Sequence, residues 1–142
     1  MDIGQASGQA SPVVDGRLRH QYPRLADWLE AADHAQRVDR VRLLSEHAAD
    51  ATAVSDRCIA AERLDALVET LDEVAWTIQE AVDDGSATSE EYEYAFRRAR
   101  AANAWAIAHV DSSLEGSSAA VYEVLAALGG SESAVLTILN AE

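Results

Sequence analysis

The sequence predicts an all-α protein: an antiparallel four-helix bundle with a short fifth helix at the C-terminus and a flexible N-terminal arm. Three observations predict this fold. First, Ala, Leu and Val supply most of the apolar residues, which make up 49% of the 142 positions, and β-branched runs are absent. Second, long segments repeat apolar residues at the gaps of three and four that mark one face of a helix. Third, the connections between these segments are short, which favours antiparallel neighbours.

The chain divides into an arm and a single domain. Residues 1–20 are rich in Gly, Ser, Gln and Ala, a composition that predicts a flexible arm. Residues 21–142 are sufficient to bury a core without disulfides or metals. The arm lacks the basic start and the apolar segment of a secretory signal, and no segment is apolar enough to span a membrane. We therefore expect a cytoplasmic protein.

The first helix is expected from Pro23 to about Ala51, because proline suits a first turn and an apolar face begins at Leu25. Beyond residue 35 the apolar spacing is three only, and each such step rotates the stripe by about 60°. The helix either breaks near Gln36 or stays continuous and buries different faces along its length; we favour one long helix. The drifting stripe would then leave three residues for another helix or for a second subunit, which would make the protein a homodimer: Val38, Val41 and Ala48.

The second helix is expected over Ser55 to Asp84, which has the most regular pattern in the chain. Ser55 or Asp56 can serve as its N-cap, and Asp84-Gly85 ends it. The apolar face consists of Cys58, Ala61, Leu64, Leu67, Val68, Leu71, Val74, Ala75, Ile78 and Val82.

A stripe of carboxylates lies broadly opposite that apolar face, and Trp76 falls among them. Trp76 either packs against a neighbouring helix at the edge of the core, which the usual burial of large aromatic residues favours, or anchors a contact surface with an acidic rim. Asp83 also belongs to the stripe but is not one of the candidate partner-binding residues. On the second interpretation, the candidate partner-binding residues are Glu62, Asp65, Glu69, Asp72, Glu73, Trp76 and Glu80.

The third helix is expected to open with a capping box at Thr88-Ser89-Glu90-Glu91. Small residues at Ala95, Ala99 and Ala102 would permit close approach of a neighbouring helix. We expect Asn103, at the edge of this face, to be a hydrogen-bonded core amide rather than a ligand contact.

A basic cluster on the same helix is formed by Arg97, Arg98 and Arg100. We expect these arginines to pair within the chain, and Glu93 stands four residues before Arg97 in the favourable orientation. Arg97 and Arg100 are expected to point away from the core.

The C-terminal part is expected to contain a turn over Asp111–Ser118 with Gly116 as its pivot. A fourth helix should follow from about Ser117 to Leu128, ended by Gly129-Gly130. Ser131 can cap the short fifth helix.

The charge of the chain constrains its partners. Its 25 acidic residues exceed its 11 basic residues, all of them Arg, and the net charge is −14. Such a chain repels phosphate backbones, so we expect neither nucleic-acid nor membrane binding, and a basic protein is the partner of matching sign. Codon usage in a GC-rich genome or adaptation to high salt would also explain the acidity.

No catalytic, metal or cofactor site is predicted. Glu30 and His34 stand at i,i+4, but no Glu stands three residues before any His, so the di-iron pattern is missing. Nucleophile elbows and phosphate-binding loops are also missing. We expect His109 to be a partly buried histidine, and Cys58, the single cysteine, to be a buried hydrophobic residue.

The favoured function is that of a non-enzymatic acidic interaction protein, such as an adaptor, an antitoxin-like inhibitor or an assembly subunit. It would bind a basic protein partner, self-associate, or do both. Reversing the charge of Glu69 and Asp72 should weaken partner capture. The alternative is a small-molecule or metal-binding bundle with a possible weak catalytic role. Its site would use Asn103, Trp105 and His109 inside the bundle, or His34 on the outside of the bundle.

Overall fold

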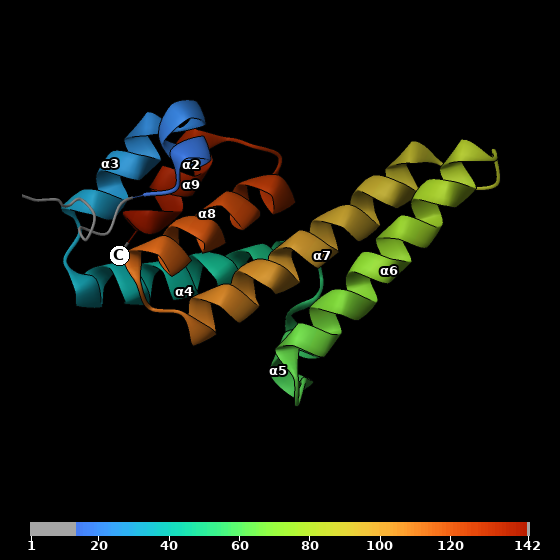
Figure 1. Cartoon of the computed structure of the whole chain (residues 1–142), viewed down its shortest axis with the longest axis horizontal. Helices are drawn as coiled ribbons and strands as arrows, with labels where there is room; N and C mark the ends of the chain where they lie inside the picture. The colour runs from blue at the N-terminus through green and yellow to red at the C-terminus, as the bar shows by residue number, and fades with distance from the viewer. Residues whose placement is uncertain (1–13, 142) are drawn as a thin grey trace, which may run out of the picture.

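A computed structural model describes residues 14–141, and the described part of the chain is built entirely from helices (Figure 1). The all-α prediction is confirmed; an antiparallel four-helix bundle is not. Residues 14–141 form the helices α2 (Gly16–Gln21), α3 (Pro23–Ala31), α4 (His34–Ala51), α5 (Ser55–Ala60), α6 (Leu64–Asp83), α7 (Ser89–Val110), α8 (Leu114–Leu128) and α9 (Glu132–Leu139).

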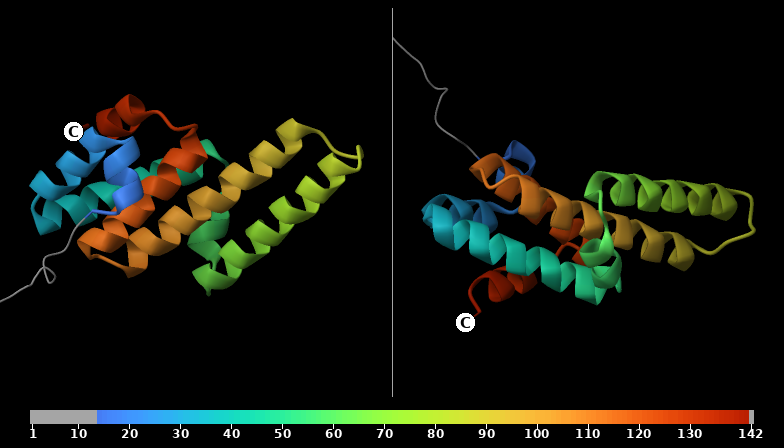
Figure 2. Two further views of the ribbon diagram at one scale, coloured as in Figure 1. Left: turned by 45° about the horizontal axis from the view of Figure 1, so that its top comes forward. Right: turned by 90° about the horizontal axis from the view of Figure 1, so that it is seen from below.

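The helices form a body and a projecting hairpin. The body contains α2, α3, α4, α8 and α9 together with the C-terminal half of α7, whose alanines 101, 102 and 104 are fully buried. Helix α6 packs along α7 and contacts α5 at its beginning. Both views of Figure 2 show that the tip of this α6–α7 hairpin stands clear of the other helices. None of the described helices has the length and apolar character needed to cross a membrane.

The first predicted helix, Pro23 to Ala51, is two helices. Ala32 is extended and Asp33 caps α4 by accepting a hydrogen bond from the Gln36 backbone N–H at 2.8 Å. This break explains the drifting apolar stripe, because α3 and α4 each bury their own apolar face. Val41 and Ala48 are therefore fully buried in this chain and Val38 is half-buried, so these three residues do not form an exposed self-association surface.

The second predicted helix is also two helices, because Ala61 is extended and α6 starts anew at Leu64. The predicted cap Ser55 is instead the first residue of α5, and its hydroxyl bonds the side chain of Asp50. Glu62 consequently lies in the connection before α6 rather than on the acidic stripe. The predicted end is confirmed, with Asp84 as C-cap and Gly85 at a φ of +86°.

Helix α7 begins as predicted with a capping box. The Glu91 backbone N–H donates to the Thr88 hydroxyl at 3.1 Å, and the Thr88 backbone N–H donates to the Glu91 carboxylate at 2.8 Å.

Helix α8 begins at Leu114, earlier than the predicted start at Ser117, because the Ser113 hydroxyl caps it by accepting from the Gly116 N–H at 3.0 Å. Gly116 thus lies in the first turn of a helix rather than at the pivot of a turn. The predicted stop at Gly129 is confirmed by its left-handed conformation.

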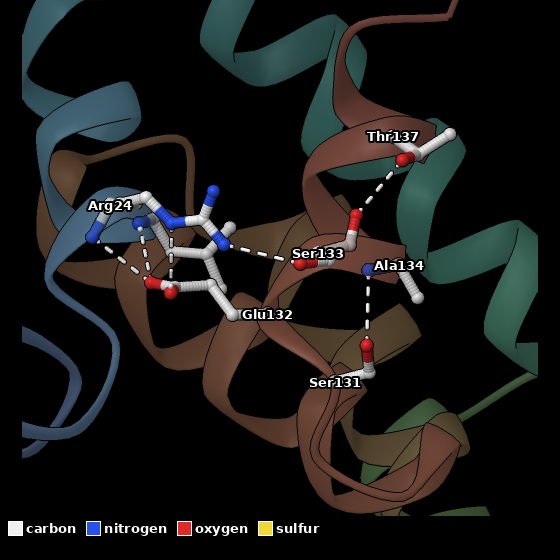
Figure 3. A network of polar contacts seen from close by, with 7 residues as sticks. Arg24, Ser131, Glu132, Ser133, Ala134 and Thr137 are labelled. Atoms are coloured by element: carbon white, nitrogen blue, oxygen red, sulfur yellow. Dashed lines mark hydrogen bonds and ion pairs between the residues drawn. The ribbon is translucent and has the colours of Figure 1, made fainter.

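The two terminal segments pack on the body. Residues 1–13 of the predicted arm lie outside the described range. Residues 14–20 are not the flexible segment that was expected, because they include the N-cap Asp15 and most of α2, with Leu18 fully buried. Ser131 caps α9 as predicted. Figure 3 shows Glu132 of α9 beside Arg24, whose backbone N–H donates to the Glu132 carboxylate; this bond is 3.0 Å long. The backbone N–H of Leu25 donates to the same carboxylate oxygen at 3.2 Å. A carboxylate from α9 therefore caps the first turn of α3, which has no side-chain cap of its own.

Cys58 is buried, as predicted, with 3% of its surface exposed. Burial disfavours the thiolate and raises the pKa of Cys58 from 9.0 to about 11. Near pH 8 the native thiol should therefore react with iodoacetamide at least about a hundredfold more slowly than the thiol of the unfolded chain. Alkylation rates measured with and without denaturant would check this, and equal rates would contradict it.

Candidate protein-binding surface on helix α6

The outward side of α6 carries an exposed aromatic ring surrounded by carboxylates. Trp76 exposes 67% of its surface, so the edge-of-core alternative favoured from the sequence is incorrect. Around it, α6 exposes carboxylates on the side opposite its buried residues Leu67, Leu71 and Ala75, with Asp72 at the edge nearest α7. We define the acidic face as Asp65, Glu69, Asp72, Glu73, Trp76 and Glu80, all of which are exposed.

A shallow hollow lies on this face. It is lined by Asp65, Val68, Glu69, Asp72, Glu73, Trp76 and Thr77. The hollow brings together five of the seven residues predicted to bind a partner along with Trp76's neighbour Thr77 and the half-buried Val68 at its base. Glu80 extends the face toward the hairpin tip, and Glu62 is exposed at the opposite end, before the helix starts.

The carboxylates of the acidic face differ in what they already bind. Asp65 pairs with the neighbouring Arg63 at 2.7 Å, and this hydrogen bond lowers the pKa of Asp65. The side chains of Glu69 and Glu73 make no hydrogen bond or ion pair with any residue between 14 and 141. These two groups are available to a partner without first breaking an internal contact.

Asp72 is engaged inside the chain. Its carboxylate lies 2.5 Å from a guanidinium nitrogen of Arg100, and a second nitrogen of Arg100 lies 2.6 Å from Glu123 on α8. Asn103 donates to the same Glu123 oxygen at 2.8 Å, which confirms its predicted role as a hydrogen-bonded amide. Arg100 therefore links α6, α7 and α8 and is only 20% exposed, contrary to its predicted outward orientation.

The other arginines of the basic cluster also make contacts within the chain, although of these two only Arg97 pairs with a carboxylate as predicted. Arg97 lies 3.4 Å from Glu93 in the predicted i,i+4 pair. Arg98 donates to the carbonyl of Ala53 at 3.3 Å, which connects α7 to the end of α4.

The residues considered for metal or small-molecule binding do not converge. Glu30 pairs with Arg19, and the ring of His34 lies 3.3 Å from Arg37. His109 stacks on Trp105 with ring centroids 4.8 Å apart, and its Nε2 lies 3.5 Å from Glu46. Across residues 14–141, no three His, Cys, Asp or Glu side chains are grouped so that they could hold a metal ion.

Sequence reasoning missed one surface, on the flank of α6 away from the acidic face. Val74 was assigned to the core, but 44% of its surface is exposed. The sequence feature that could have indicated this surface is the group of uncharged residues next to Val74 on the helical wheel: Thr70, Thr77 and Ala81.

Comparison with known proteins finds no family model, no curated protein and no solved structure that matches this chain.

Proposed function

We propose that this protein is a non-enzymatic interaction protein, an adaptor, antitoxin-like inhibitor or assembly subunit, whose acidic face binds a basic protein partner. The observation that carries the proposal is the 67% exposure of Trp76 on a ridge of carboxylates. Exposing a ring of this size to water is unfavourable, and partially buried tryptophans rimmed by polar groups are typical anchors of protein interfaces.

The charge of the face supports a partner of opposite sign. Within the acidic face the only arginine contacts are those of Asp65 and Asp72, so Glu69, Glu73 and Glu80 add uncompensated negative charge around Trp76. A chain with a net charge of −14 attracts basic surfaces at long range, and the ridge concentrates this attraction beside an apolar contact. A Lys- or Arg-rich surface with an apolar centre is the complementary partner.

The variant Glu69→Arg/Glu73→Arg tests the charge. Asp72, which the sequence analysis suggested for reversal, is unsuitable because its reversal would also break the Arg100 pair. We expect affinity capture from a lysate of the source organism, quantified by mass spectrometry, to recover at least about tenfold less of the basic partner. The matched control is Asp39→Arg/Asp56→Arg, which makes the same charge change at exposed residues outside α6. Equal losses in both variants would contradict a localised site.

The variant Trp76→Ala tests the anchor on the same captured partner. Loss of an interface tryptophan should weaken binding by roughly thirtyfold or more. Tyr94→Ala is the control, because Tyr94 is 56% exposed but lies on α7, outside the acidic face. Unchanged affinity of the Trp76 variant would exclude the ring as the anchor.

A further inference from the structure

The flank of the hairpin opposite the acidic face is uncharged on α6. There α6 presents Thr70, Val74, Ile78 and Ala81. Thr77 and Glu73 form its border with the acidic face, and the other carboxylates of that face lie farther round the helix. Val74 leaves 44% of its surface exposed to water. In a chain of net charge −14, an uncharged apolar strip is a surface on which a second copy can approach without like-charge repulsion.

This strip borders a groove between α6 and α7 with a volume of about 230 Å³, which we name the Val74 groove. Leu71, Val74 and Ile78 form its α6 side, and Tyr94 and Ala95 form the centre of its α7 side. Tyr94 is 56% exposed. Two charged residues complete the lining, Glu91 and Arg98.

The order of the charges along the groove makes it complementary to itself. Glu91 and Arg98 lie seven residues apart on α7, about two helical turns, with Tyr94 and Ala95 between them. A two-fold axis that crosses the groove at right angles to the helices, next to Tyr94, reverses this order in the second copy. Arg98 of one subunit then faces Glu91 of the partner subunit, and the opposite pair forms at the other end. Val74 and Tyr94 lie close to the axis and meet their own copies.

The geometry points to a two-fold symmetric homodimer formed through the Val74 groove, in which two α6–α7 hairpins pack as a four-helix bundle. A hairpin that contacts the body at one end only leaves its apolar flank in water, and pairing two such hairpins covers it. The acidic faces stay outside this interface, so the dimer does not depend on the proposed binding of a basic partner.

Sedimentation velocity of the full chain, over a range of concentrations, tests the dimer. The wild type should sediment as a dimer that dissociates on dilution. Val74→Glu places two carboxylates opposite each other near the axis and should raise the dimer dissociation constant by about a hundredfold or more. Val110→Glu is the matched control: Val110 is 80% exposed outside the groove, so this variant should dimerise normally.

A charge reversal gives a second test that does not rely on Val74. Arg98→Glu should weaken the dimer by placing acidic groups opposite each other, whereas Arg98→Gln removes the cation without adding a carboxylate and should weaken it less. Glu91 is left unchanged because its carboxylate caps α7. Circular dichroism would establish that each variant remains helical. A wild type that is monomeric at every concentration would overturn the dimer, and a dimer that tolerates both Val74→Glu and Arg98→Glu would overturn the groove as its interface. The single variant Glu69→Arg, at a residue that does not border Val74, should dimerise normally, which separates this proposal from that of the basic partner.

Discussion

Arg100→Met is expected to lower the free energy of unfolding by about 2–3 kcal/mol. The substitution keeps an unbranched apolar side chain but removes the guanidinium, and it leaves Glu123, whose side chain is 16% exposed, without its cation. A buried charge that loses its partner costs about 3–5 kcal/mol, and the partial exposure of Asp72 and Arg100 lowers this figure. Urea unfolding followed by circular dichroism measures the change.

Arg97→Met is the control for this prediction. Arg97 is on the same helix, but its i,i+4 pair with Glu93 is solvent-exposed, so its loss should cost no more than about 0.5 kcal/mol. If the two variants were equally stable, the ion pairs of Arg100 with Asp72 and Glu123 would not stabilise the packing of α6 and α8 on α7. Arg100→Met/Glu123→Met would recover part of the loss, because it removes the unpaired carboxylate as well.

Gly116→Ala is expected to destabilise the protein by about 1–3 kcal/mol, although alanine normally favours a helix over glycine by about 1 kcal/mol. A Cβ at this position would lie 2.3 Å from Cγ of Asp111 and 2.6 Å from its backbone carbonyl oxygen. The side chain of Asp111 can rotate away, but the carbonyl can move only with the backbone. The connection between α7 and α8 would have to shift.

The control for this second prediction is Gly16→Ala in α2, where a Cβ would meet no atom within 4 Å. That variant should be as stable as the wild type or slightly more stable. Thermal unfolding of both variants measures these changes in stability. A Gly116→Ala protein whose melting temperature is equal to or above that of the wild type would show that the α7–α8 connection can shift without loss of stability.

The sequence predicted the helix ends that carry a strong local signal. The capping box at Thr88, the left-handed Gly129 and the cap at Ser131 each use short-range hydrogen bonds or backbone freedom that a single residue type provides. A break in the first helix was considered near Gln36 but not favoured, and the break at Ala61 was not foreseen; neither of the observed breaks, at Ala32 and Ala61, involves Pro or Gly. Asp33 does cap α4, but aspartate is also common on exposed helix faces, so it did not distinguish a break from a continuous helix.

The candidate surface was predicted only in part, for a physical reason. Helical periodicity placed the carboxylates of α6 and Trp76 on one side, and they are exposed together. Periodicity cannot show how many neighbours a helix has. Trp76 was expected at the edge of the core, and Val74 inside it, on the assumption of a bundle in which α6 has several neighbours; with α7 as its main neighbour, both residues face water. The contact between Asp72 and Arg100 depends on the tertiary register of two helices.

The attachment of the hairpin at one end has an evolutionary consequence. Because the loop from Asp84 to Ala87 touches none of the body helices, α6 and α7 can gain or lose whole turns together without disturbing the packing of α4, α8 and α9. The reach of the hairpin can therefore change between related chains while the core residues stay fixed.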